Sequence, residues 1–126
     1  MDPKMRQTVQ IELKASDGHQ LAAYVAEPSG KPRGGVVVIP EIFGVNSHIQ
    51  SVSDGFAADG YLAVSPAMFD RAQRNYDTGY SQPEIQAGVA IMQRLDWKQS
   101  MLDVQAAIAE AKKGGKVGIV GYCYGG

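Results

Sequence analysis

The sequence predicts an α/β fold in which an N-terminal antiparallel hairpin is followed by parallel strands with flanking helices. Three observations carry this prediction. Two early segments alternate apolar and polar residues with a period of two, which is typical of strands with one buried face. The later runs VVVI and VGIV are continuously apolar, as in strands that are covered on both faces. Segments with helical spacing separate those runs, and this alternation indicates a parallel sheet.

The hairpin is expected from residues 8–13 and 19–26, which are joined by the turn cluster Ser16-Asp17-Gly18. Glycine suits such a turn because it adopts a positive φ without steric cost. The alternation gives each strand one apolar face. These faces comprise Val9, Ile11 and Leu13 in the first strand and Leu21, Ala23 and Val25 in the second.

Residues 36–39 predict the first buried strand, and a helix that ends at Gly60 is expected after it. Asn46 or Ser47 is expected to cap the start of that helix, since both side chains accept hydrogen bonds from exposed backbone amides. The short apolar run 61–64 predicts the next strand. Strand, helix and strand together form a unit for which a right-handed crossover is the strong default.

The second half of the chain predicts two more helices and one more strand. Residues 65–79 are expected to be irregular, and a helix is expected over 83–95, where a proline suits the first turn. Another helix is expected to begin at Ser100, because Ser-x-x-Asp matches a capping box, and to end at Gly114-Gly115. Residues 116–121 predict a third buried strand.

Composition limits the class of protein. The 126 residues are expected to form one domain, residues 1–126. A net charge of −1 argues against a dedicated binder of nucleic acid or anionic membrane. No apolar run reaches the roughly 18 residues of a membrane span, and the N-terminus lacks the apolar core of a secretory signal. The single cysteine makes no internal disulfide and excludes a zinc site built from several thiolates, so we expect a reducing compartment, the cytoplasm.

The last six residues carry the strongest chemical motif. Gly121-Tyr122-Cys123-Tyr124-Gly125 has the form Gly-x-nucleophile-x-Gly, the nucleophile elbow, with cysteine in place of the usual serine. Such an elbow follows a buried strand, exposes the thiol at the edge of the sheet, and directs the amide of Tyr124 at the position of a developing oxyanion. A structural cysteine buried in a glycine-rich turn is the alternative.

The loop after the first buried strand is the second chemical element. In α/β-hydrolases the corresponding loop supplies another oxyanion-hole amide. An acidic residue is unexpected there, because a carboxylate repels a developing oxyanion, so Glu41 needs a different partner. The thiol of Cys123 is the obvious candidate. A solvated loop carboxylate is the alternative.

Together these residues resemble a known family. EIFGVN (41–46) and KVGIVGYCYGG (116–126) are similar to the dienelactone hydrolase family of α/β-hydrolases, and the similarity runs from the hairpin to the end of the chain. The resemblance implies a partial α/β-hydrolase fold. It also implies hydrolysis of lactones and related esters through a Cys-His-Asp triad, without a metal or an organic cofactor and with a small-molecule substrate.

The resemblance also implies roles for individual residues. Cys123 matches the nucleophile, and Glu41 matches the glutamate that helps to form the thiolate. The amides of Ile42 and Tyr124 match the oxyanion hole. An arginine after the fourth strand binds substrate carboxylate in the family, and Arg71 is the match, with an exposed loop arginine as the equal alternative. Arg74 is a second choice for that role.

Family members are about twice as long as this chain, so the resemblance implies a truncated domain that ends at the elbow. The later strands of the family carry the triad acid and histidine, and their loss is expected to impair turnover and to expose a sheet edge that promotes self-association. His48 is expected on the surface of the first helix and His19 in an exposed turn. Other side chains are expected to serve structure: Asp103 as a helix cap, and Trp97, Tyr76 and Tyr80 in packing or loop anchoring.

Three functions therefore follow from the sequence. The leading one is a dienelactone-type hydrolase that cleaves a small lactone or ester by cysteine attack. The second is a catalytically inactive α/β fragment or interaction module in which Cys123 has no role. The third is a thioesterase or acyltransferase that uses the same elbow, since a fold does not fix its substrate.

Overall fold

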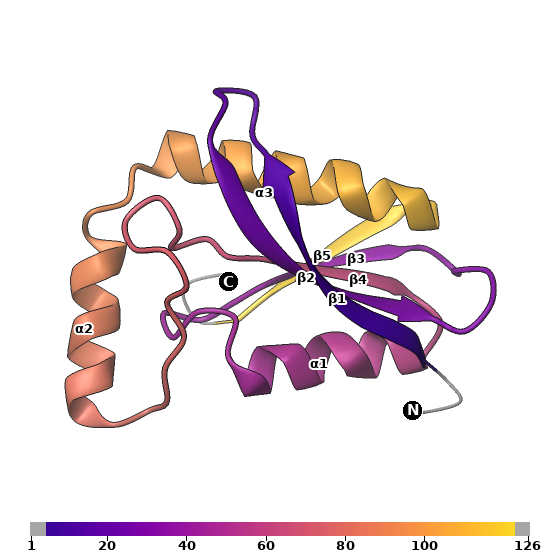
Figure 1. Ribbon diagram of the computed structural model, residues 1–126, viewed down its shortest axis with the longest axis horizontal. Coiled ribbons are helices and arrows are strands. Elements are labelled where there is room, and N and C mark those ends of the chain that lie inside the picture. The colour runs from indigo at the N-terminus through magenta and orange to yellow at the C-terminus, as the bar shows by residue number, and fades with distance from the viewer. Residues whose placement is uncertain (1–4, 123–126) are drawn as a thin grey trace.

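The computed structural model describes residues 5–122 and contains one mixed sheet with helices on both faces (Figure 1). The strands lie in the order β1-β2-β4-β3-β5. Their bounds are β1 Met5–Lys14, β2 Gln20–Pro28, β3 Gly35–Ile39, β4 Leu62–Pro66 and β5 Val117–Gly121. The predicted α/β class is confirmed, because an antiparallel hairpin is joined to a parallel sheet.

The predicted antiparallel hairpin is present, and its register aligns the two apolar faces. Leu13 pairs with Leu21, and Ile11 pairs with Ala23, so the two apolar faces coincide. Burial increases along β1 from Val9, which is exposed, to Leu13, which is buried. β2 then pairs with β4 in antiparallel fashion, whereas β3 is parallel to both β4 and β5. The hairpin thereby extends the parallel sheet on one side.

The first helix, α1 (Ser47–Ala58), begins and ends as the sequence predicts. The side chain of Asn46 accepts a hydrogen bond from the amide of Ile49 at 3.1 Å and so caps the N-terminus. Gly60 follows the last turn with a φ of +100°, a conformation that glycine adopts at little cost. Of the two predicted caps, the structure selects Asn46.

The second helix, α2 (Gln82–Met92), starts at a capping box. The hydroxyl of Ser81 accepts from the amide of Glu84, and the Glu84 carboxylate accepts from the amide of Ser81. The hydroxyl of Ser81, which donates to Oε1 of Glu84 at 2.7 Å, lowers the pKa of the Glu84 carboxyl below its usual value, and the amides of Gly79 and Ser81 act in the same direction. The expected extension to Leu95 is wrong, because the helix ends at Met92 and residues 93–94 form a turn.

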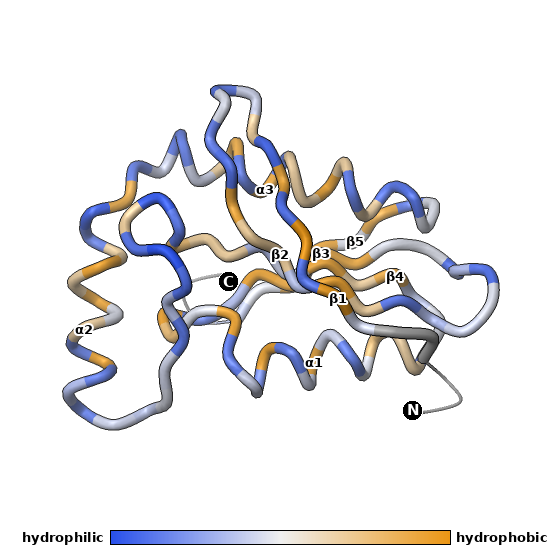
Figure 2. The backbone as a smooth tube through the Cα atoms, viewed as in Figure 1, coloured by the Kyte–Doolittle hydropathy of each residue, from blue (hydrophilic) through white to orange (hydrophobic). Residues whose placement is uncertain are grey.

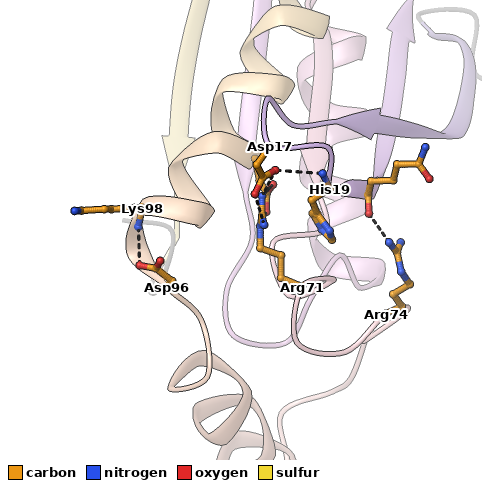
Figure 3. A network of polar contacts seen from close by, with 8 residues as sticks. Asp17, His19, Arg71, Arg74, Asp96 and Lys98 are labelled. Atoms are coloured by element: carbon orange, nitrogen blue, oxygen red, sulfur yellow. Dashed lines mark hydrogen bonds and ion pairs between the residues drawn. The ribbon is translucent and has the colours of Figure 1, made fainter.

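The third helix, α3 (Trp97–Ala111), begins three residues before the predicted start. Asp96 is the N-cap, and its carboxylate accepts from the amide of Lys98 at 3.1 Å (Figure 3). Ser100 and Asp103 therefore lie inside the helix, and the expected capping role of Asp103 is wrong. A 3-10 turn, η1 (Lys112–Gly114), then leads to β5.

The core has two unequal parts, because α1 and α3 cover opposite faces of the sheet (Figure 1). The smaller cluster lies on the α1 face and consists of Ala26, Ala57 and Ala63 with Tyr24 and Phe56 packed against it. The larger cluster joins the sheet to α3, α2 and the loops after β3 and β4. Its fully buried members include Leu21, Val37, Val64, Ala107 and Ala111. Figure 2 shows that apolar residues concentrate along the central strands and on the helix faces that meet them.

Candidate active site

The register of β3 and β5 brings the two sequence motifs to the same edge of the sheet. Ile39 at the end of β3 pairs with Gly121 at the end of β5. Glu41 follows Ile39 by two residues, and Cys123 follows Gly121 by two residues. Neighbouring parallel strands end at the same edge, which is where ligands bind in open α/β sheets. Cys123 and Tyr124 themselves lie outside the described residues.

Glu41 is partly buried and has a defined partner. Its Oε1 accepts a hydrogen bond from the hydroxyl of Tyr80 at 3.0 Å. The phenol oxygen of Tyr80 in turn lies 3.3 Å from Nδ2 of Asn46, which donates to it. In the described chain Glu41 therefore has a side-chain partner that comes from a distant loop. Sequence analysis missed the roles of Tyr80 and Asn46 at this site.

The loop that carries Ile42 is fixed by two close backbone approaches. Gly44 has a φ of +79° and lies directly against the carbonyl group of Tyr76, where no side chain fits. Gly88 of α2 lies against the carbonyl oxygen of Ile42, which would be 2.5 Å from a Cβ added to Gly88. Because neither glycine has a side chain, the backbone near Tyr76 and helix α2 can both pack directly against the loop that carries Ile42.

The backbone amide of Ile42 is available as a hydrogen-bond donor. Ile42 is 7% exposed and lies in the turn that follows β3. Its amide donates to no acceptor among residues 5–122, whereas Gly44 donates to the carbonyl of Glu41. Buried amides without an acceptor are rare in proteins, and oxyanion holes are one place where they occur. An amide without an acceptor is compatible with the oxyanion-hole role expected for Ile42.

Arg71 is already paired with two carboxylates (Figure 3). Its Nε and Nη2 donate to Asp103 at 2.9 Å each, and its Nη1 and Nη2 donate to Asp17 at 2.8 and 3.1 Å. Four of the five N–H bonds of the guanidinium are thus used. These two acids raise the pKa of Arg71 further above its usual range. Arg74 is more exposed, and its Nη2 donates to the carbonyl of Gln20 at 2.6 Å.

Within residues 5–122, His48, His19 and Trp97 form no hydrogen bond or ion pair with Glu41. His48 lies exposed on α1, as expected. His19 is not exposed as expected but partly buried, because it follows the hairpin turn where the loop after β4 packs, and its Nε2 is buried. Trp97 is 71% exposed at the first turn of α3, so it does not pack in the core, which was one of the two roles expected for it.

Other kinds of site receive little support. No group of three metal-ligating side chains exists in the described part of the chain. Within residues 5–122, no helix combines the length and the apolar character needed to cross a bilayer. A pocket of about 140 Å³ lies beside β2, lined among others by Tyr24, Asp70 and Asn75, but it includes neither Glu41 nor Ile42. The sheet edge at β3 and β5 therefore remains the candidate site.

Comparison with known proteins decides the family. The model of the dienelactone hydrolase family matches residues 21–126, a range that includes both motifs, strands β3, β4 and β5, and all of β2 except its first residue. This chain belongs to the dienelactone hydrolase family. The family resemblance inferred from EIFGVN and the elbow is confirmed, and so is the α/β-hydrolase type of fold.

Individual relatives agree with this membership of the dienelactone hydrolase family. The chain is 39% identical over 113 residues to a Synechocystis protein assigned to the carboxymethylenebutenolidases, with 85% of this chain and 46% of that protein covered. It is 32% identical over 121 residues to the carboxymethylenebutenolidase of Pseudomonas putida, with 92% and 51% covered. A Klebsiella pneumoniae crystal structure assigned to the dienelactone hydrolases superimposes with a TM-score of 0.73 at 26% identity, with 95% and 52% covered. The chain thus spans about half the length of these relatives.

Proposed function

We propose that the chain supplies the nucleophile and the oxyanion hole of a hydrolase that cleaves small lactones or esters. The observation that carries the proposal is the pairing of Ile39 with Gly121 in parallel strands. Because Glu41 and Cys123 follow these partners at equal distances along the chain, an acid and a thiol are expected side by side at one sheet edge. Family membership supports the same chemistry.

In the proposed reaction, the carboxylate of Glu41 takes the proton from the thiol of Cys123. The thiolate attacks the carbonyl carbon of the substrate, a C–S bond forms, and the carbonyl electron pair moves to oxygen. The amides of Ile42 and Tyr124 donate to this oxyanion. When the carbonyl re-forms, the C–O bond to the alcohol breaks and the alkoxide takes up a proton. Water then hydrolyses the thioester and releases the acid.

The last steps need a group that carries protons. In the dienelactone hydrolase family this group is a histidine oriented by an aspartate. The proposal assigns this role to neither His19 nor His48, because neither shares a hydrogen bond with Glu41 in the described chain. No step needs a metal or an organic cofactor. A reduced thiol is required, so the proposal places the protein in a reducing compartment such as the cytoplasm.

We propose that a substrate carboxylate binds Arg71 only if it displaces one of the two carboxylates that already pair with the guanidinium. Asp17 occupies one edge of the guanidinium and is the more exposed of its two partners, with a side-chain exposure of 32% against 1% for Asp103. A carboxylate-bearing lactone would therefore have to replace Asp17. Arg74, whose side chain is 53% exposed, is proposed as the secondary contact.

The test is the reactivity of Cys123, the single thiol of the chain. We expect iodoacetamide to alkylate it about tenfold faster than free cysteine at neutral pH, and Glu41→Gln to remove most of that gain. Glu110→Gln on α3 is the matched control, because it changes a carboxylate that pairs with Lys113 away from the site. A slow thiol that is insensitive to Glu41→Gln would favour an inactive module. Faster turnover of thioesters than of lactones and esters would favour a thioesterase.

A further inference from the structure

We infer that Tyr80 is a positioning residue for the candidate site, because its hydroxyl holds the carboxylate of Glu41 where that carboxylate can accept the proton of the nucleophile. The inference rests on the proposed function, since it assigns a structural partner to the residue that is proposed to deprotonate Cys123. It concerns a side chain from a loop 39 positions away in the sequence.

The direction of the hydrogen bonds is fixed by the chemistry of the three side chains. An ionised carboxylate only accepts, so the hydroxyl of Tyr80 donates to Oε1 of Glu41 across 3.0 Å. The amide nitrogen of Asn46 only donates, so Nδ2 points its hydrogen at the phenol oxygen across 3.3 Å. Asn46 thereby leaves the proton of Tyr80 free for Glu41. The three groups form one chain of donors that ends on the carboxylate.

The ring of Tyr80 is held in place although the residue is 50% exposed. It packs edge to face against Phe43, with a centroid separation of 4.4 Å and an interplanar angle of 66°. The backbone beside it is joined to the same loop, because the amide of Thr78 donates to the carbonyl of Phe43 at 2.9 Å. Nδ2 of Asn46 also donates to the carbonyl of Thr78 at 2.9 Å. The hydroxyl therefore has a defined position relative to Glu41.

This arrangement leaves Oε2 of Glu41 available to accept the proton of the thiol. Oε1 is occupied by Tyr80, whereas Oε2 accepts no hydrogen bond from any side chain or amide in residues 5–122. Transfer of the thiol proton to Oε2 would give a thiolate and a carboxylic acid that keeps its hydrogen bond to Tyr80. Fixing the base in this way raises its effective concentration at the thiol, whereas a free side chain samples several rotamers.

The phenol remains a donor over the pH range in which the site would work. Partial burial and the neighbouring Glu41 carboxylate raise the pKa of Tyr80 above its ordinary value of 10.0, although the amide of Asn46 opposes this. Tyr80 is thus protonated at neutral pH and is positioned to hold the carboxylate, not to act as a base.

The experiment compares four variants of the full chain: Tyr80→Phe, Tyr76→Phe, Glu41→Gln and the double variant Tyr80→Phe/Glu41→Gln. Tyr80→Phe keeps the ring on Phe43 and removes only the hydroxyl. Tyr76→Phe is the matched control, since it removes a hydroxyl from the same loop that has no hydrogen-bond partner in the described chain. The readout is the rate of alkylation of Cys123 by iodoacetamide between about pH 6 and pH 9, with a thermal melt of each variant.

We expect Tyr80→Phe to slow alkylation at neutral pH by about threefold to tenfold and to move the pH profile upward. Tyr76→Phe should leave the profile unchanged. In the Glu41→Gln background, Tyr80→Phe should have no further effect, because the residue acts through the carboxylate. Additive effects of the two substitutions would overturn the inference, and so would a Tyr80→Phe chain that reacts like the parent while Glu41→Gln slows the reaction.

A second readout separates this inference from the proposed function. Glu41→Gln should lower the pH at which Tyr80 ionises, measured from the NMR shift of its Cζ, because a neutral amide no longer opposes the phenolate. An unchanged ionisation of Tyr80 would show that the contact does not form and would overturn the inference alone. If the ionisation shifts but Glu41→Gln leaves alkylation unchanged, the role of Glu41 in the proposed function fails and the positioning role fails with it.

Discussion

Arg71 and Asp103 form a bidentate ion pair in which Nε and Nη2 of the guanidinium donate to different carboxylate oxygens at 2.9 Å. The pair is largely removed from water, with side-chain exposures of 10% and 1%. Arg71 follows β4 and Asp103 lies on α3, while Asp17 contacts the same guanidinium from the hairpin turn. One arginine therefore joins three segments at the edge of the sheet that carries the candidate site.

Loss of one partner of this pair should be costly. We expect Asp103→Ala to reduce the free energy of unfolding by about 3 kcal/mol, because it leaves a nearly buried guanidinium with an unpaired edge. Urea denaturation followed by circular dichroism measures the change. Glu110→Ala on the same helix is the control, since its pair with Lys113 is solvent-exposed and should be worth at most about 0.5 kcal/mol. Equal losses for the two variants would contradict the structural role of Asp103.

The pairing of Asp17 with Arg71 predicts a pH dependence of stability. The guanidinium and the amide of His19 lower the pKa of Asp17 from 3.8 to about 2. A carboxyl whose pKa is lower when folded contributes stability that is complete above its unfolded pKa and is lost as the pH falls through its folded pKa. We therefore expect this contribution to disappear between about pH 4 and pH 2. In urea melts over that range, the stability difference between the parent and Asp17→Asn should shrink as the pH falls. A constant difference would contradict the assignment.

Local patterns were sufficient to predict most of the fold. The runs at β3 and β4 are recognisable because strands covered on both faces are continuously apolar, and the hairpin is recognisable from its alternation. The run at β5 is apolar too, but the expectation that it is a buried strand is wrong, since its residues are exposed or only partly buried. The start of a helix is harder to predict where two residues near each other can both serve as its N-cap. Asp96 and Ser100 both precede apolar residues at helical spacing, and the structure starts α3 at Asp96, which leaves Trp97 in solvent.

The contacts of the candidate site could be predicted only in part. The motifs at Glu41 and Cys123 are each local, so sequence could identify them. Tyr80 lies in an irregular loop, and nothing in its neighbourhood indicates a partner 39 residues earlier. The same holds for Arg71, whose two acids are 54 residues before it and 32 residues after it. Such contacts depend on tertiary packing, which periodicity and capping patterns do not encode.

Gly88 offers a test of how α2 fixes the loop of Ile42. Alanine normally stabilises a helix interior relative to glycine by about 0.5–1 kcal/mol. At Gly88, however, the new Cβ would lie 2.5 Å from the carbonyl oxygen and 3.2 Å from the Cβ of Ile42. We expect Gly88→Ala to lower the free energy of unfolding by about 1–3 kcal/mol, because the backbone must move apart. It should also slow alkylation of Cys123.

Gly55 in α1 is the matched control for that substitution. It also lies inside a helix, but a Cβ added there meets nothing within 4 Å. Gly55→Ala should therefore raise stability by about 0.5–1 kcal/mol and leave alkylation unchanged. Chemical denaturation of both variants measures the two changes. If Gly88→Ala instead raised the free energy of unfolding, the loop of Ile42 could move away from the new Cβ at little cost, and α2 would not fix its position.

The exposed side of β5 predicts self-association of the 126-residue chain. Among the described strands β5 pairs with β3 alone, and Ile119 at its centre is 54% exposed. β1 is the opposite edge strand, but it carries Glu12 and Lys14, and charges of this kind oppose edge-to-edge pairing. The sequence of β5, VGIVG, has no charge. An apolar, uncharged edge is a template for a second strand, so we propose that two copies associate through β5.

Sedimentation velocity over a range of concentrations tests this proposal. The parent chain should sediment faster as its concentration rises, and Ile119→Lys should weaken association by about tenfold or more, since it places a charge in exposed apolar surface that association would bury. Val9→Lys is the matched control, because Val9 is a partly exposed apolar residue, 39% exposed, on the other edge strand. Equal effects of the two substitutions would indicate association through both edges. Association that only Val9→Lys weakens would place the contact at β1, where the charged side chains would then have to be accommodated.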